Sequence, residues 1–203
     1  DSAEDWAPDP ALLRVLEDGP PPVYVGFGSM AGRDPERLAS LVVEALDRAG
    51  LRGILATGWG GMKTGDLPDT VLRIDHAPHD WLFAKVAAVV HHGGAGTTSA
   101  ALRAGKPAVV VPFSVDQPFW ASRVHALGAA PAPIPLKRLE AEPLAVALGE
   151  ATSNRAMIDH AATIGGKISR EDGVARAVVL IERYAALSPP PPSAKADPCS
   201  TPD

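Results

Sequence analysis

The chain contains 203 residues, of which 46% are hydrophobic, and it carries a formal net charge of −5 at pH 7. This length is sufficient for one domain with a sizeable buried core. The negative charge argues against a general nucleic-acid binder, whose phosphate contacts favour a basic surface.

Short apolar runs alternate with amphipathic segments along the chain. Asp9-Pro10 and Asp34-Pro35 each place an N-cap residue before a proline at the first helical position, so they predict helices at 10–16 and 35–49. Buried strands are predicted at 23–27, 51–56, 71–74, 87–91, 108–111 and 129–132. Further helices are predicted at 79–83, 97–103, 118–127, 144–150, 154–164 and 172–187.

This alternation predicts an α/β fold, a Rossmann-like parallel sheet with helices on both faces. In such folds, ligands bind outside the carboxyl ends of the strands. Glycine-rich or polar loops follow predicted strands at 28–29, 57–61, 76–79, 91–98 and 112–117. We therefore expect the binding site at this edge of the sheet.

The two ends of the chain carry further information. The chain starts at Asp1 without methionine and shows neither a signal peptide nor an apolar run of bilayer length, so we expect a fragment or processed chain without a transmembrane segment. The folded domain is predicted at 1–187, and 188–203, which is rich in proline, is predicted to be a disordered tail. The single cysteine, Cys199, excludes an internal disulfide and fits a reducing compartment, so a cytoplasmic location is expected.

Residues 91–98, with the sequence His-His-Gly-Gly-Ala-Gly-Thr-Thr, join a predicted strand to a predicted helix. A glycine-rich bend before a helix offers free backbone N–H groups and the positive end of the helix dipole, which together hold phosphate. His92, Thr97 and Thr98 add side-chain donors. Because no lysine or arginine lies between 86 and 101, we predict a diphosphate site built mainly on backbone groups.

The adjacent histidines point to opposite faces of a strand, so at most one of them faces a ligand. His92 lies beside the glycines and is the candidate, whereas His91 is expected to be hydrogen-bonded in the core or at its rim. The pair lacks the spacing of a helical zinc site and no other ligand cluster is visible, so no metal is expected.

Residues 26–31, Gly-Phe-Gly-Ser-Met-Ala, fit the loose glycine pattern of dinucleotide-binding folds. That site also needs an acidic residue at the end of the second strand to bind ribose, and here the strand ends in Ala56-Thr57, so NAD binding is not expected. The phosphate-binding loop that ends in Gly-Lys-Ser/Thr is absent as well. Gly28 and Ser29 either donate hydrogen bonds to phosphate or form an ordinary turn.

Three other loops have two interpretations each. Asp116 and Gln117 precede a predicted helix, so they either bind sugar hydroxyls, which both donate and accept hydrogen bonds, or cap the helix. His76 and His79 either offer flat rings for a base or belong only to a turn. Trp59 either fills its own glycine-rich loop or faces a nucleotide.

Together, these residues resemble the C-terminal, donor-binding half of the UDP-glycosyltransferase superfamily with the two-domain GT-B fold. The ordered blocks 74–83, 91–98 and 112–120 carry the resemblance, which extends over residues 9–187 and is strongest to bacterial and sterol-type members. It implies an inverting hexosyltransferase that uses a UDP- or dTDP-linked sugar as substrate and requires no metal or other cofactor. The acceptor would be a lipophilic or natural-product hydroxyl bound by the N-terminal domain.

The resemblance also implies roles for the matching positions. The donor diphosphate is expected at Ser29, His92, Gly94, Gly96, Thr97 and Thr98. The donor sugar is expected at Asp116 and Gln117. The base and ribose are expected at Trp59, His76 and His79, although plant members have tryptophan in place of His76 and glutamine in place of His79.

Members of this superfamily displace the nucleotide directly, after a histidine of the N-terminal domain takes the acceptor proton. No catalytic base is therefore identified in this chain, and the chain alone is not expected to be competent. Two alternatives stay open. One is an isolated nucleotide-sugar-binding module without activity, and the other is a nucleotide-sugar epimerase, for which Asp116 would be the single acid/base candidate.

Overall fold

A computed structural model describes residues 6–28, 34–57 and 66–187 of the chain. The chain divides into two units, Asp1–Ser169 and Arg170–Asp203, which are described separately. Within the described ranges, every strand lies in the first unit and the last helix lies in the second. The predicted tail at 188–203 lies outside the described residues.

The first unit is built around a parallel sheet of five strands in the order β3-β2-β1-β4-β5. The strands are β1 (Val23–Gly26), β2 (Gly53–Ala56), β3 (Val71–Ile74), β4 (Val89–His91) and β5 (Ala108–Val110). After three strands on one side, the chain crosses β1 and continues with β4 on the other side. The order therefore reverses between β1 and β4, which is the position where ligands bind in doubly wound sheets.

The strand register aligns the carboxyl ends of all five strands. Gly26 is paired with Ala56 on one side and with His91 on the other, while Ala56 pairs with Ile74 and His91 with Val110. The loops that follow these residues therefore leave the sheet along the same edge. This arrangement confirms the parallel α/β fold that was predicted from the sequence.

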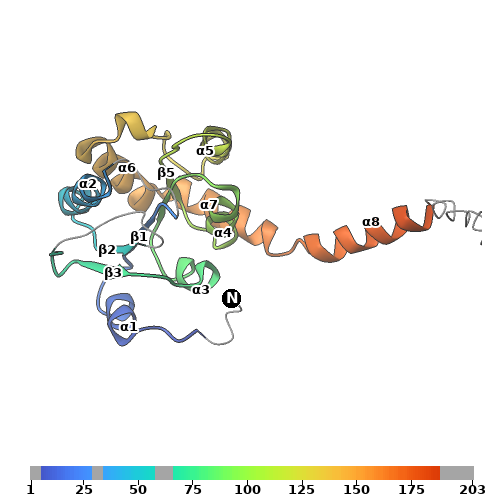
Figure 1. The fold of residues 1–203 in the computed structure, drawn as a ribbon, viewed down its shortest axis with the longest axis horizontal. Helices are drawn as coiled ribbons and strands as arrows, with labels where there is room; N and C mark the ends of the chain where they lie inside the picture. Colours follow the sequence, from blue (N-terminus) through green and yellow to red (C-terminus); the bar gives the residue numbers. More distant parts are fainter. Residues whose placement is uncertain (1–5, 29–33, 58–65, 188–203) are drawn as a thin grey trace, which may run out of the picture. The chain divides into compact units, whose positions relative to one another are not determined.

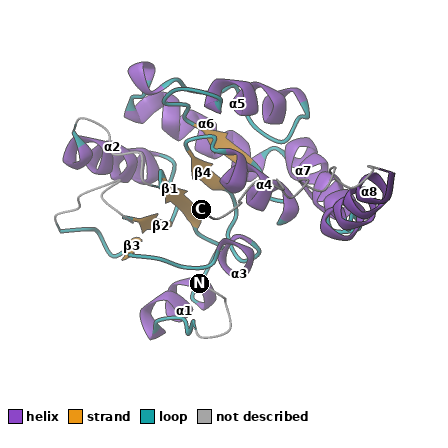
Figure 2. Cartoon of the chain, turned by 45° about the vertical axis from the view of Figure 1, so that its right-hand side comes forward, coloured by secondary structure: helices purple, strands orange, loops and turns teal. Residues whose placement is uncertain are grey.

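Helices cover both faces of the sheet (Figures 1 and 2). One face packs against α2 (Pro35–Arg48) and α6 (Ala141–Ser153), and the opposite face against α1 (Pro10–Glu17), α3 (His79–Phe83) and α4 (Ala95–Arg103). Successive strand residues point to opposite faces. In β1, Val23 and Val25 accordingly join the α2–α6 core, whereas Tyr24 joins the other core.

Two further helices pack around the edge strand β5. They are α5 (Gln117–Ala126) and α7 (Arg155–Ile168), and a short 3-10 helix, η2 (Leu136–Arg138), precedes α6. A small core joins this region through Val110, Val124 and Ala161. Because α7 also packs along α4, it supports the helix that follows the glycine-rich loop.

The predicted strand at 129–132 is not a strand in the structure. Its backbone makes isolated hydrogen bonds at the two ends of β5, from the Ala108 N–H to the Ala129 carbonyl and from the Ile134 N–H to the Val110 carbonyl. Pro131 lacks the N–H group that a continuous ladder requires. Among the helices, α4 begins two residues earlier than the predicted start at 97.

The second unit contains α8 (Gly173–Leu187), which confirms the last predicted helix. The carboxylate of Asp172 caps it by accepting a hydrogen bond of 3.0 Å from the Ala175 N–H. Its exposed apolar side chains include Val174, Val179 and Ile181. No helix in the described ranges is long and apolar enough to cross a membrane.

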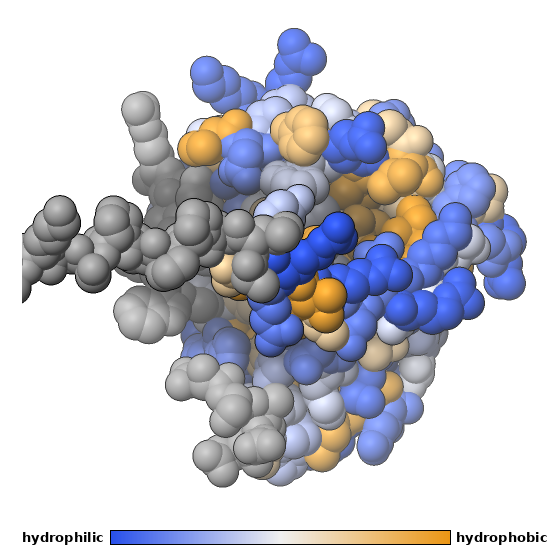
Figure 3. Space-filling model, turned by 90° about the vertical axis from the view of Figure 1, so that its right-hand side faces the viewer, coloured by the Kyte–Doolittle hydropathy of each residue, from blue (hydrophilic) through white to orange (hydrophobic). Residues whose placement is uncertain are grey.

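In the first unit, a few large apolar side chains are exposed, among them Val115 and Phe119. Both lie close in sequence to Asp116, a residue of the predicted site. Figure 3 shows one face of the molecule, on which hydrophobic side chains lie between hydrophilic ones.

Candidate functional site

The loop between β4 and α4 forms the centre of the candidate site. His91 is fully buried, and its Nδ1 accepts a hydrogen bond of 3.0 Å from the Gly93 N–H. Gly93 adopts a left-handed φ of 91°, which turns the chain sharply toward α4. Gly94 then occupies the N-cap position without a side-chain cap. The first N–H groups of α4 are consequently not capped by a side chain at Gly94, which leaves them available to an anion.

His92 lies between two glycines that follow different strands. A Cβ atom on Gly94 would lie 2.5 Å from its Nε2, and a Cβ atom on Gly28 would lie 3.4 Å from its Cε1. The imidazole therefore occupies space that any side chain at Gly94 would take. Burial lowers the pKa of His92, and the Asp116 carboxylate raises it by a smaller amount. Burial therefore disfavours the charged form of this ring, which lies at the β1–β4 switch point.

Besides Nε2 of His91, two polar atoms of this loop are buried and have no hydrogen-bond partner in the described part of the chain. They are Nδ1 of His92 and Oγ1 of Thr98, whose side chain is only 3% exposed. Buried polar groups normally have hydrogen-bond partners. Thr97 is half-buried and Gly96 is exposed, so these two predicted phosphate contacts are accessible from solvent.

The loop between β5 and α5 lies against the same glycine-rich turn. A Cβ atom on Gly93 would lie 3.1 Å from the carbonyl oxygen of Gln117. Gln117 itself is buried, and its Oε1 accepts hydrogen bonds from the N–H groups of Phe113 (2.7 Å) and Ser114 (3.1 Å). Its amide oxygen therefore holds its own loop, and the amide nitrogen is the part of the side chain that is left for a ligand.

Asp116 is exposed at the start of α5. It makes no side-chain cap, and its Oδ2 instead accepts a hydrogen bond of 2.9 Å from the Trp120 indole N–H. The structure thus does not support the helix-capping alternative for Asp116. The residue before it, Val115, has φ 60° and is 91% exposed. A β-branched residue in this conformation is strained, and such strain is typical of functional loops.

A second group of rings lies beneath the site on the α3 side. The Tyr24 hydroxyl lies 3.5 Å from Nε2 of His79, and the His79 ring stacks on Phe83 with a centroid distance of 4.4 Å. Burial raises the pKa of Tyr24 to about 12 and lowers the pKa of His79. A neighbouring charge on His76 lowers the His79 pKa further, whereas Asp80 raises it.

A cavity of about 670 Å³ lies between α3 and α4. It brings together His76, His79 and Gly96, which the sequence analysis assigned to the nucleoside and to the diphosphate. Sequence analysis missed two charged residues of this cavity, Asp80 and Arg103. The spacing of Gly96, Ser99 and Arg103 places them on one face of α4 and was the signal that could have identified Arg103.

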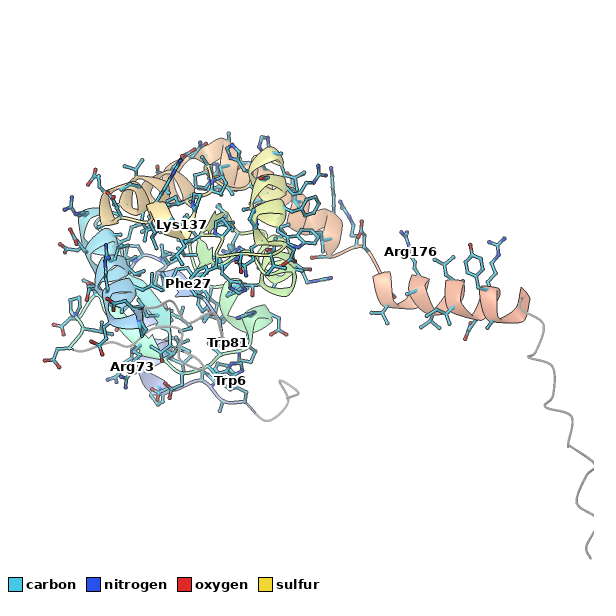
Figure 4. The ribbon with its side chains drawn as sticks, turned by 45° about the horizontal axis from the view of Figure 1, so that its top comes forward. Trp6, Phe27, Arg73, Trp81, Lys137 and Arg176 are labelled. Carbon is cyan, nitrogen blue, oxygen red and sulfur yellow. The ribbon has the colours of Figure 1, made fainter. Side chains whose placement is uncertain are left out.

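A smaller cavity of about 270 Å³ adjoins the same region, between α1 and the end of β3. Its lining includes Trp6, Arg73 and His76, so His76 borders both cavities. Trp6 packs edge-on against Trp81 with a centroid distance of 4.9 Å. Figure 4 labels both residues, which lie next to each other. This contact ties the segment before α1 to α3, the helix that carries His79.

Two predicted site residues and the predicted absence of a metal remain to be compared with the structure. Ser29 and Trp59 lie outside the described residues. Within the described ranges, no group of three or more His, Cys, Asp or Glu side chains could hold a metal ion. The described residues that were predicted to bind the diphosphate, base and sugar lie in the loops after β3, β4 and β5 or at the starts of the helices that follow them, along one edge of the sheet.

Sequence comparison relates the chain to known enzymes. The family model for the erythromycin biosynthesis protein CIII-like, C-terminal domain matches residues 54–184. A sterol 3-beta-glucosyltransferase of Arabidopsis thaliana is 45% identical over 179 residues, which cover 88% of this chain and 28% of that protein. A sterol 3-beta-glucosyltransferase of Yarrowia lipolytica is 44% identical over 195 residues, which cover 90% of this chain and 13% of that protein. The chain therefore spans less than a third of these relatives.

Solved structures share the fold. CalG4, the calicheamicin glycosyltransferase, matches with a TM-score of 0.74 at 24% identity, covering 92% of this chain and 47% of that chain. The glycosyltransferase VinC, solved in complex with dTDP, matches with a TM-score of 0.71 at 25% identity, covering 85% of this chain and 44% of that chain. The first unit thus has the fold of one half of these glycosyltransferases.

Proposed function

Because the chain belongs to the UDP-glycosyltransferase superfamily, in the family of erythromycin biosynthesis protein CIII-like C-terminal domains, we propose that it binds the donor of an inverting glycosyltransferase. The donor is a UDP- or dTDP-linked hexose, and the acceptor is the hydroxyl of a lipophilic or natural-product molecule. The names of the plant and yeast relatives support a sterol-like acceptor. Binding of that acceptor belongs to the N-terminal half of the enzyme.

One observation carries this proposal. The cavity between α3 and α4 opens at the uncapped N-terminus of α4, so it joins a site for an anion to a space large enough for a nucleoside. A nucleoside diphosphate has this combination of groups. The Asp116 carboxylate affects the pKa of His92, which indicates that the loop predicted to bind the sugar lies near the phosphate end of the site.

The same arrangement suits the departure of a nucleoside diphosphate. As the bond to the anomeric carbon breaks, negative charge builds up on the leaving phosphate oxygen. The fixed N–H groups of α4 stabilise that charge without reorganisation. Burial disfavours the protonated form of the free His92 ring, and a diphosphate beside it would favour that form. His92 would then donate a charge-assisted hydrogen bond to the leaving group.

Calorimetric titration of the chain with UDP and with inorganic pyrophosphate tests this function. His92→Ala is expected to weaken both ligands by about tenfold or more, the loss of one hydrogen bond to a charged group. His160→Ala is the control, since His160 is an exposed histidine on α7, away from the site. An unchanged UDP affinity in His92→Ala would remove His92 from the phosphate site. A wild-type chain that binds neither UDP nor dTDP would contradict the donor-binding function.

A cytoplasmic location is part of the proposal, because the single cysteine fits a reducing compartment. The bacterial resemblance stays a prediction, since the relatives described above come from a plant and a yeast.

A further inference from the structure

Arg103 and Asp80 face the α3–α4 cavity from opposite sides, and neither was assigned to the donor by the sequence. Arg103 has no hydrogen-bond or ion-pair partner among the described residues. Asp80 also lines the cavity, and its Oδ1 accepts a hydrogen bond of 3.0 Å from the Trp81 N–H. The two side chains line the same cavity and do not form an ion pair with each other.

The position of Arg103 along α4 indicates which part of a nucleotide it would meet. Gly96 lies at the diphosphate end of the helix, and Arg103 lies seven residues on, about 10 Å along the axis. Side chains on a helix lean toward its N-terminus, so the Arg103 guanidinium extends back over Ser99 and Ala100. The small side chains at 99 and 100 leave the space beneath it free. In a nucleoside diphosphate, the group bonded directly to the diphosphate is the ribose, so the ribose is the next part of the ligand along this face of α4.

We propose that Arg103 and Asp80 recognise the ribose of the donor nucleotide, an inference that rests on the proposed function. Each ribose hydroxyl both donates and accepts hydrogen bonds. Guanidinium N–H groups only donate and an ionised carboxylate only accepts, so the two side chains together satisfy both functions of a 2′,3′-diol. His79 borders the same space from α3, and its ring is already held by Phe83 and Tyr24.

The test compares UDP, 2′-deoxy-UDP and inorganic pyrophosphate by calorimetry on the 203-residue chain. The wild type is expected to bind UDP about tenfold more tightly than 2′-deoxy-UDP, the scale of one hydrogen bond to a charged group. Arg103→Gln and Asp80→Asn are each expected to bring this ratio close to one. Neither variant should change the affinity for pyrophosphate, which has no ribose.

Arg123→Gln is the matched control. Arg123 lies in the last turn of α5 as Arg103 lies in the last turn of α4, so both substitutions remove the same favourable charge from a helix C-terminus. The control should keep the wild-type ratio of UDP to 2′-deoxy-UDP affinity. Unfolding curves of all variants verify that each one is folded.

Two results would overturn the inference while leaving the donor-binding function intact. One is a wild type that binds UDP and 2′-deoxy-UDP equally well. The other is an Arg103→Gln variant that keeps the wild-type ratio, including the case in which UDP and 2′-deoxy-UDP weaken equally because Arg103 contacts the base. Failure of the wild type to bind both UDP and pyrophosphate would instead contradict the proposed function, and the inference with it.

Discussion

Three histidines near the site differ in burial and in chemical role. His91 is fully buried and fixes the glycine turn through Nδ1, whereas His92 is half-buried at the mouth of the site. His79 is stacked on Phe83 and belongs to the nucleoside side of the cavity. The sequence analysis separated His91 from His92 by the alternation of strand side chains, and the structure confirms that His91 is hydrogen-bonded in the core.

His91 gives the fold a specific pH dependence. Burial, with smaller effects from the charges of His92 and His79, lowers its pKa from 6.5 to about 3. Between these two values the unfolded chain binds a proton that the folded chain does not, so stability falls as the pH falls below 6.5. The expected slope from this residue is about 1.4 kcal/mol per pH unit.

Urea unfolding between pH 7.5 and 4.5 measures this slope. His91→Asn keeps an acceptor near the position of Nδ1 but does not titrate, so its stability should depend less steeply on pH. His160→Asn is the control for the same substitution at an exposed histidine. Equal slopes in the wild type and in His91→Asn would show that His91 is not held neutral by burial.

Asp116 is predicted to recognise the sugar rather than the phosphates. Asp116→Ala should weaken binding of a UDP-sugar by about tenfold or more, as expected for a hydrogen bond involving a charged group, and should weaken UDP much less. Because Asp116 makes no helix cap, the free energy of unfolding should change little. Calorimetry with both ligands and an unfolding curve give the two quantities.

Asp116→Asn is the matched control, since the amide oxygen can still accept the hydrogen bond from the Trp120 indole. If Asp116→Ala lowers the affinity for UDP and for the UDP-sugar by the same factor, the carboxylate does not bind the sugar.

At the scale of elements, α4 is positioned by a close contact with α7. Gly105 follows α4 with φ 68°, and a Cβ atom on Gly165 of α7 would lie 2.7 Å from the Gly105 Cα. The next residue, Gly166, has nothing within 4 Å of its Cβ position. Two adjacent glycines of one helix therefore have opposite steric environments.

This difference predicts opposite effects of the same substitution. Gly165→Ala should destabilise the protein by about 1–3 kcal/mol, because the added methyl group meets backbone atoms that cannot move aside. Gly166→Ala should stabilise it by about 0.5–1 kcal/mol through helix propensity alone. Thermal or urea unfolding of the two variants gives both values. Stabilisation by Gly165→Ala would show that α7 does not pack this closely on α4.

The predicted elements show which signals in the sequence are sufficient. The Asp-Pro pairs located the starts of α1 and α2, and in both helices the aspartate accepts the capping hydrogen bond, at 2.7 Å for Asp9 and 2.9 Å for Asp34. The segment 129–132 was mispredicted because its apolar composition resembled a strand, whereas Pro131 prevents a continuous ladder. Local composition thus located most elements. In this segment, the missing backbone N–H group of Pro131 prevented the strand that the composition suggested.

At the scale of the whole molecule, the sequence predicted at which edge of the sheet the site lies, but it did not predict the cavity beside that edge. The loops after β3, β4 and β5 could be placed together because parallel strands end on one side. The cavity between α3 and α4 could not be predicted, since it depends on how far apart two helices lie. Asp80 and Arg103 read from the sequence as ordinary exposed charges and become neighbours of one space only in the fold.

The length of the relatives leads to a prediction for the chain as a whole. The chain spans 28% of the Arabidopsis protein and should bind the donor without the rest of such an enzyme, because the cavity and the α4 N-terminus lie within one unit. It should transfer glucose to a sterol at a negligible rate, since the base is expected in the other half. Isothermal calorimetry with UDP-glucose and a product assay by mass spectrometry measure both. Efficient transfer by this chain would locate a catalytic base within it.

The small space between Gly93 and the Gln117 carbonyl has a consequence for exchanging parts between related enzymes. A Cβ atom on Gly93 would lie 3.1 Å from that carbonyl oxygen, so the glycine-rich turn and the loop held together by Gln117 limit each other's shape. To transfer a donor preference from one enzyme to another, both loops would therefore have to be exchanged together. A chimera that receives only one of them would inherit the new side chains without the geometry that makes them useful.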